Sequence, residues 1–127
     1  MRVLVVDDDR NVLATISAMI QAERPGWTVD CVGDSYEALK RLNDLPYDVI
    51  LSDLHMPQLD GISLLKQVRA MLSFMPVVFL TGYKDRYAAA AWELGAFAVL
   101  DKPVEMDLLI QSLEAAVLQR AARTKVC

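Results

Sequence analysis

Hydrophobic and polar positions follow two different periods along this 127-residue chain. Short apolar runs rich in β-branched residues predict five strands, at 2–6, 27–32, 48–52, 76–80 and 97–100. Between these runs and after the last one, apolar residues recur every three to four positions, which predicts helices at 10–23, 34–44, 61–72, 84–94 and 104–122. Strict alternation of strands and helices is typical of a parallel sheet with helices on both faces, so the sequence predicts the α/β class.

Local signals refine these boundaries. The run at 27–32 alternates apolar and polar residues more than the other runs do, so it is expected at an edge of the sheet. Asp34 or Ser35 is expected to cap the second helix, because short side chains with an oxygen accept hydrogen bonds from the first helical N–H groups. Pro103 is expected in the first turn of the last helix, and Gly95 at the end of the fourth.

Composition and charge restrict the class of protein. Apolar residues form 54% of the chain and charged residues 24%, an ordinary balance for one globular domain. That domain is predicted over 1–122, with 123–127 as a tail or the start of a linker to an output domain. The formal net charge of -4 and the lack of a Lys/Arg cluster argue against direct nucleic-acid binding. No apolar stretch is long enough to span a membrane, so no membrane association and a cytoplasmic location are expected.

Charged or hydroxyl-bearing side chains follow four of the five predicted strands. They are, in chain order, Asp7, Asp8, Asp9, Asp53, Thr81 and Lys102. Because the carboxyl ends of parallel strands meet at one edge of a sheet, these side chains are expected to converge. Adjacent carboxylates repel one another, so a cation is expected among them.

This set of side chains suits phosphoryl-transfer chemistry. Mg²⁺ prefers oxygen ligands, commonly one or two carboxylates with several waters and phosphate oxygens, and two of the first-strand acids together with Asp53 could supply the carboxylates. An aspartate carboxylate can also attack phosphorus when a metal and a cation neutralise the transferring oxygens. Lys102 would be that cation, and Thr81 would donate a hydrogen bond to the phosphoryl group.

Four segments together resemble the receiver domain of two-component response regulators. They are VVDDD at 5–9, DVILSDLHMPQLDG at 48–61, FLTG at 79–82 and LDKP at 100–103. The resemblance covers nearly the whole chain. It implies the flavodoxin-like receiver fold, a (βα)₅ arrangement in which a doubly wound, five-stranded parallel sheet has the order 2-1-3-4-5.

The resemblance also implies a role for each matching residue. Asp53 matches the phosphoacceptor, and Asp7 and Asp8 match the acidic pair around Mg²⁺ or Mn²⁺. His55 matches the residue whose backbone carbonyl completes the metal shell, and its side chain is expected to be exposed beside the pocket. Thr81 matches the switch hydroxyl of the family, and Lys102 matches its lysine. The peptide bond between Lys102 and Pro103 is typically cis in the family.

The implied function is that of a phosphoacceptor module in a bacterial two-component system or phosphorelay. A sensor histidine kinase or a histidine phosphotransfer protein would supply the phosphoryl group to Asp53, and a change of conformation would control a partner or an output domain. The module would assist only its own phosphorylation and dephosphorylation, so it is not expected to be an enzyme for an external metabolite. Homodimerisation through 84–122 is a further expectation from the family.

The sequence departs from the family pattern at Val99, and two residues that follow Thr81 bear on the lifetime of the phosphoryl group. The family usually places Tyr or Phe where this chain has Val99, and Phe97 is expected on the same strand face but too far from the site to replace it. The response to phosphorylation is therefore expected mainly in 81–94. Gly82 is expected to leave room over the pocket, and Tyr83 to shield the phosphoryl group and slow its hydrolysis.

Other interpretations remain open for some of these residues. Asp7 and Asp9 also form the Asp-x-Asp of haloacid-dehalogenase-type phosphatases, although Asp9 is equally suited to cap the first helix. Val99 leaves room for a phosphorylation-independent binding module that acts through its 84–122 surface. Gly61 is expected to supply special backbone geometry in the turn that precedes its helix.

Overall fold

The structure is a computed structural model that describes residues 1–55, 61–82 and 87–125, with side chains described as far as residue 122. Strands and helices alternate along these residues. They are β1 (Arg2–Val6), α1 (Arg10–Glu23), β2 (Thr28–Val32), α2 (Ser35–Asp44), β3 (Val49–Asp53), α3 (Gly61–Met71), β4 (Val77–Thr81), α4 (Ala88–Glu93), β5 (Ala98–Asp101) and α5 (Met106–Lys125).

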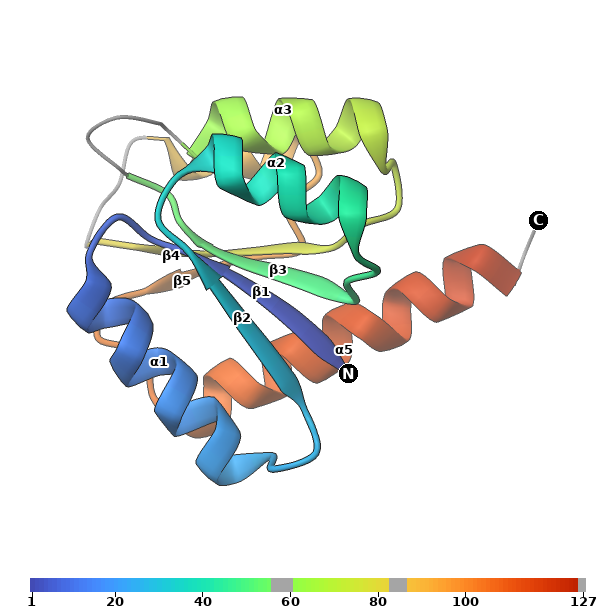
Figure 1. Cartoon of the computed structure of the whole chain (residues 1–127). Coiled ribbons are helices and arrows are strands. Elements are labelled where there is room, and N and C mark those ends of the chain that lie inside the picture. Colours follow the sequence, from blue (N-terminus) through green and yellow to red (C-terminus); the bar gives the residue numbers. More distant parts are fainter. Residues whose placement is uncertain (56–60, 83–86, 126–127) are drawn as a thin grey trace.

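The strands form one parallel sheet in the order β2-β1-β3-β4-β5, which confirms the predicted fold. Figure 1 shows α1 and α5 on one face of this sheet and α2 and α3 on the other. β2 is an edge strand, as its alternating pattern predicted. All carboxyl ends of the strands therefore lie at the same edge, where the predicted site residues are found.

Each face of the sheet is covered by its own hydrophobic core, because successive strand side chains point to opposite faces. In β4, Phe79 packs with residues of α2, α3 and α4, whereas Val78 and Leu80 pack with residues of α1 and α5. These three side chains are almost fully buried, and burying each one contributes about 1.5–3 kcal/mol. β4 is thus held firmly between two cores.

Capping side chains and one glycine set the limits of three helices close to where the sequence predicted them. Asp9 caps α1 by accepting hydrogen bonds from the backbone N of Asn11 at 2.9 Å and of Val12 at 3.4 Å. Asp34, rather than Ser35, caps α2. Gly95 follows the end of α4 with a φ of 92°, a conformation that favours glycine.

The start of α5 corrects one prediction. Pro103 does not lie in the first helical turn, because α5 begins at Met106 and its first helical hydrogen bond runs from Leu109 N to the carbonyl of Glu105. The Lys102–Pro103 peptide bond is cis, as the family resemblance implied. Among the described residues, no helix combines the length and apolar character needed to cross a membrane.

Candidate phosphoacceptor site

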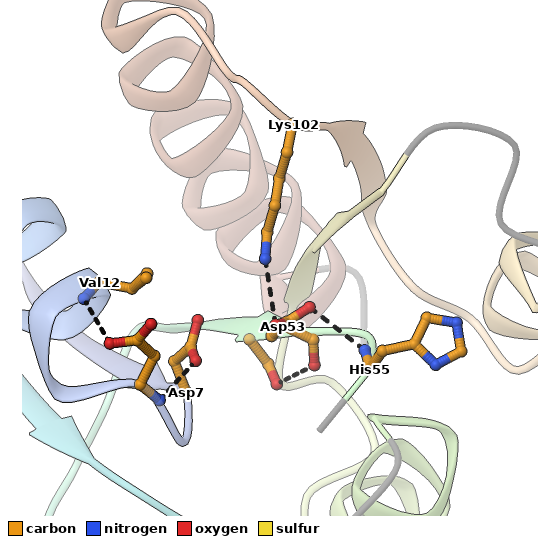
Figure 2. A network of polar contacts seen from close by, with 7 residues as sticks. Asp7, Val12, Asp53, His55 and Lys102 are labelled. Atoms are coloured by element: carbon orange, nitrogen blue, oxygen red, sulfur yellow. Dashed lines mark hydrogen bonds and ion pairs between the residues drawn. The ribbon is translucent and has the colours of Figure 1, made fainter. Parts of the chain in front are cut away.

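Asp53 is the last residue of β3, a strand that lies between β1 and β4. Its Oδ2 lies 3.1 Å from Nζ of Lys102, and its Oδ1 accepts a hydrogen bond from the backbone N of His55 at 3.2 Å (Figure 2). The Asp53 side chain is 13% exposed and the Lys102 side chain 38%, so the ion pair stands where an incoming group can reach it. The two residues are 49 positions apart, and the parallel sheet brings them together.

Asp7 directly follows β1 and is buried beside Asp53 (Figure 2). Its Oδ1 accepts a hydrogen bond from the backbone N of Asp9 at 2.9 Å. Burial raises the pKa of Asp7, and the neighbouring Asp53 and Asp8 raise it further, while the Asp9 N–H and Lys102 act in the opposite direction. The ionised form of Asp7 is therefore less favourable here than in water, and a nearby cation would favour it.

The three consecutive acids thus have three different environments. Asp7 is buried, Asp8 is exposed next to it, and the carboxylate of Asp9 is used to cap α1. The phosphatase alternative needed Asp7 and Asp9 to act together, and the capping role of Asp9 argues against it.

These residues suit a magnesium ion that keeps several water ligands better than one whose ligands all come from the protein. Among the residues that the structure describes, no group of three or more His, Cys, Asp or Glu side chains forms a ready metal cluster. Mg²⁺ commonly uses only one or two carboxylates and keeps several waters, however, and the buried Asp7 beside Asp53 offers this donor set.

The strand next to β3 contributes Thr81 and Gly82. Thr81 is the last residue of β4 and is buried, and its carbonyl accepts a hydrogen bond from the backbone N of Lys102 at 2.8 Å. This bond ties the lysine to the end of β4. A Cβ placed on Gly82 would meet nothing within 4 Å, consistent with the predicted open space, whereas Tyr83 lies outside the described residues.

Gly61 has a different role from the one predicted. Its φ is not in the left-handed region, so special backbone geometry is not the reason for glycine. A Cβ there would lie 2.7 Å from Cε1 of Phe79 and 3.1 Å from the carbonyl oxygen of Asp53. The first turn of α3 can therefore approach the end of β3 only because residue 61 has no side chain.

The fifth strand also corrects the sequence analysis. Val99 packs with the core under α2, α3 and α4, whereas Phe97 packs with the core under α1 and α5. The prediction that they share a face is wrong because β5 begins at Ala98, so the two-residue alternation does not extend back to Phe97.

One contact at the site had no signal in the sequence. The imidazole of His55 is exposed, as predicted, and its ring lies edge-on to the ring of Tyr87, with 5.1 Å between centroids. Tyr87 directly precedes α4. His55, two residues after Asp53, therefore contacts the residue that directly precedes α4.

Comparison with known proteins agrees with this geometry. The transcriptional regulatory protein FixJ of Bradyrhizobium diazoefficiens is 34% identical over 124 residues, which cover 97% of this chain and 60% of FixJ. The transcriptional regulatory protein GlrR of Escherichia coli (strain K12) is 34% identical over 122 residues, which cover 95% of this chain and 27% of GlrR. The chain thus spans less than two thirds of the length of these curated relatives.

Solved structures and family models lead to the same group. A response regulator receiver domain protein from Clostridium thermocellum superposes with a TM-score of 0.82 and 30% identity, over 98% of this chain and 97% of that one. The family model described as the response regulator receiver domain matches residues 3–114. The chain therefore belongs to the receiver domain family of two-component response regulators.

Proposed function

We propose that Asp53 accepts a phosphoryl group from a phosphohistidine of a sensor kinase or a histidine phosphotransfer protein, in the presence of Mg²⁺ or Mn²⁺. The observation that carries this proposal is the 3.1 Å pair between Lys102 Nζ and Asp53 Oδ2 beside the buried Asp7. An ammonium group next to a nucleophilic carboxylate can neutralise the oxygens of an arriving phosphoryl group.

The chemistry follows from these side chains. A carboxylate oxygen of Asp53 attacks phosphorus, the P–N bond to the donor imidazole breaks, and its electron pair stays on the imidazole, which takes up a proton. Lys102 then binds a phosphoryl oxygen instead of Asp53, and Thr81 donates its hydroxyl to another. When bound, the metal ion supplies positive charge, and its ligands would be Asp7, Asp8, Asp53 and the backbone carbonyl of His55.

The output of this module is a change of conformation. The backbone N–H of Lys102 donates a hydrogen bond to the carbonyl of Thr81, so movement of either residue is passed to the ends of β4 and β5. We assign the controlled element to an output domain or partner, or to a second copy bound through 84–122; the relatives named as transcriptional regulators favour an output that acts on transcription. The predicted cytoplasmic location is part of this proposal.

The decisive experiment is intact mass after incubation with acetyl phosphate and Mg²⁺. The parent chain should gain one phosphoryl group, and neither Asp53→Asn nor the parent in EDTA should do so. Asp44→Asn is the matched control, because it makes the same chemical change at an exposed position in α2. If the parent gains no phosphoryl group and binds no Mg²⁺, the phosphorylation-independent module, which Val99 favours, replaces this proposal.

Tyr83 keeps its proposed role in the lifetime of the phosphoryl group. Tyr83→Ala should lose the phosphoryl group several-fold faster than the parent, because water then reaches the acyl phosphate more easily. The decay of phosphorylated protein over time measures this rate, and an unchanged rate in the variant would contradict the role.

A further inference from the structure

A cavity of about 330 Å³ opens at the amino-terminal ends of β4 and β5, at the opposite edge of the sheet from Asp53. Charged, polar and aromatic side chains line it: Arg69, Phe74, Trp92, Phe97, Gln119 and Arg120. They come from the end of α3, from α4, from the segments before β4 and β5, and from α5.

The cavity exists because α5 is longer than the strands beside it. Its 20 residues extend for about 30 Å, whereas strands of four or five residues extend for roughly 13–17 Å. The last turns of α5 therefore pass beyond the amino-terminal ends of the strands (Figure 1). Ala116 and Arg120 on this part of the helix line the cavity.

Arg120 is held in place without a neutralising acid. Its Nη1 donates a hydrogen bond to the carbonyl of Tyr47 at 2.8 Å and lies 3.5 Å from the carbonyl of Asp48. Within the described part of the chain, no carboxylate forms an ion pair with Arg120. The hydrogen bonds of Nη1 restrict the guanidinium, and its Nε and Nη2 can bind a carboxylate with two parallel hydrogen bonds.

Arg69 adds a second fixed cation at the same cavity. It donates hydrogen bonds to the carbonyls of Met75 and Gly95, the latter at 2.7 Å. A Cβ on Gly95 would lie 3.2 Å from Nε of Arg69, so this glycine permits the close approach of α3 to the segment before β5. The chain carries a formal net charge of -4, so the guanidinium of Arg120 at this cavity marks it as a local site for an anion.

Two large aromatic side chains stand at the same place. Phe74 is 43% exposed and Trp92 is 52% exposed, and both line the cavity. Covering an exposed aromatic ring with an apolar group is favourable because it removes apolar surface from water. A second aromatic ring is a suitable group, because aromatic rings pack well against one another. The cavity thus offers a cation for one end of a ligand and aromatic surface for the other.

We propose that this cavity binds a small carboxylic acid that carries an aromatic ring, with the carboxylate on Arg120 and the ring against Trp92 and Phe74. The volume lies within the range of about 300–1,000 Å³ that is usual for small-molecule sites. Such a ligand would bridge α4 and α5. The site does not depend on phosphorylation of Asp53.

The test is a titration of the whole ¹⁵N-labelled chain with phenylacetate, followed by NMR, with phenylacetamide as the uncharged ligand of the same shape. Phenylacetate should shift the indole signal of Trp92 and the amide signals of Gly95 and Gln119 in a saturable way. Phenylacetamide should bind roughly tenfold more weakly or worse, because it lacks the charge that Arg120 recognises. The Trp92 indole is identified with Trp27→Phe, which leaves one indole signal.

Variants locate the site. Arg120→Gln and Trp92→Ala should each weaken phenylacetate binding about tenfold, whereas Arg10→Gln and Leu118→Ala, at exposed positions away from the cavity, should not. Asp53→Asn should bind as the parent does, which separates this proposal from the phosphoacceptor function. Equal binding of the acid and the amide, or unchanged affinity in a folded Arg120→Gln or Trp92→Ala variant, would overturn it.

Discussion

At the scale of single residues, the carboxyl group of Asp7 occupies a place where its charge is unfavourable. It is buried, and Asp53 and Asp8 lie close enough to raise its pKa further. A residue kept only for stability would be apolar or amide there. The buried acid therefore points to a requirement for negative charge, which the proposed Mg²⁺ ion explains.

Asp7→Asn should therefore stabilise the folded chain near neutral pH in EDTA. The folded pKa of Asp7 is raised above its ordinary value of 3.8, so the folded state loses stability as the pH rises from that value through the folded pKa. The advantage of the variant should vanish below pH 3.8, where Asp7 is protonated in both states. Urea unfolding at both pH values measures this, with Asp44→Asn as the control; an advantage of equal size at both would contradict it.

Gly61 is a residue whose importance lies in the side chain that it lacks. Gly61→Ala should lower the free energy of unfolding by about 1–3 kcal/mol, because the new Cβ would meet Phe79 and the backbone at Asp53 and Leu54. Gly26→Ala is the matched control, since a Cβ there meets nothing within 4 Å and the expected change is below about 0.5 kcal/mol. Urea unfolding of both variants makes the comparison, and equal stabilities would show that the packing around residue 61 accepts a Cβ without cost.

At the scale of elements, periodicity located each strand and helix that the structure describes, and the errors lie at the ends of these elements. The predicted and observed limits of α1 coincide, because Asp9 gives a strong capping signal. Pro103 suggested a helix start that the chain does not use, and Phe97 was placed on a strand that begins one residue later. Both errors concern residues whose position depends on packing from distant segments, which a local pattern does not contain.

A polar network around Asp30, the central residue of β2, links β2 to the start of β1 and to the segment before β3. Its Oδ2 accepts a hydrogen bond from the hydroxyl of Tyr47 at 2.6 Å and another from Nε of Arg2 at 3.2 Å. The guanidinium of Arg2 also lies 5.6 Å from the centre of the Tyr47 ring. This network fastens the edge strand β2 to the start of β1 and to the segment before β3.

Tyr47→Phe should lower the free energy of unfolding by about 2 kcal/mol, because Asp30 loses a charge-assisted hydrogen bond. Burial and Asp30 raise the pKa of Tyr47 from 10 to about 12, so the parent should lose stability as the pH rises between these values. The variant should lack that part of the decline. Urea unfolding across this range tests both statements, with the exposed Tyr36→Phe as the control.

The fifth strand should respond weakly to phosphorylation in the parent. Val99 is half-buried and has only one side-chain torsion, so it cannot swing as a larger aromatic residue does. Val99→Tyr should increase the chemical-shift changes of β5 amides on treatment with acetyl phosphate and Mg²⁺, while those in the described part of 81–94 stay large in both proteins. Equal β5 changes in parent and variant, seen by ¹H–¹⁵N NMR, would show that Val99 does not limit the response.

At the scale of the whole molecule, the sheet order turns separate sequence signals into one site. The parallel alternation predicted that Asp7, Asp53, Thr81 and Lys102 would share an edge, and the structure places them there. The cavity at the other edge was not predictable in this way. It arises from the length of α5 relative to the strands, and its arginines bond to carbonyls of segments far away in the sequence, such as Tyr47 and Gly95.

The separation of Asp53 and Lys102 also has a consequence during translation. The aspartate belongs to the third strand, and its ammonium partner is synthesised 49 positions later, after the last strand. A ribosome-bound chain that has emerged only as far as β4 carries Asp53 without this cation. Because domains generally fold as units, an unfinished chain is not expected to accept a phosphoryl group in the proposed function.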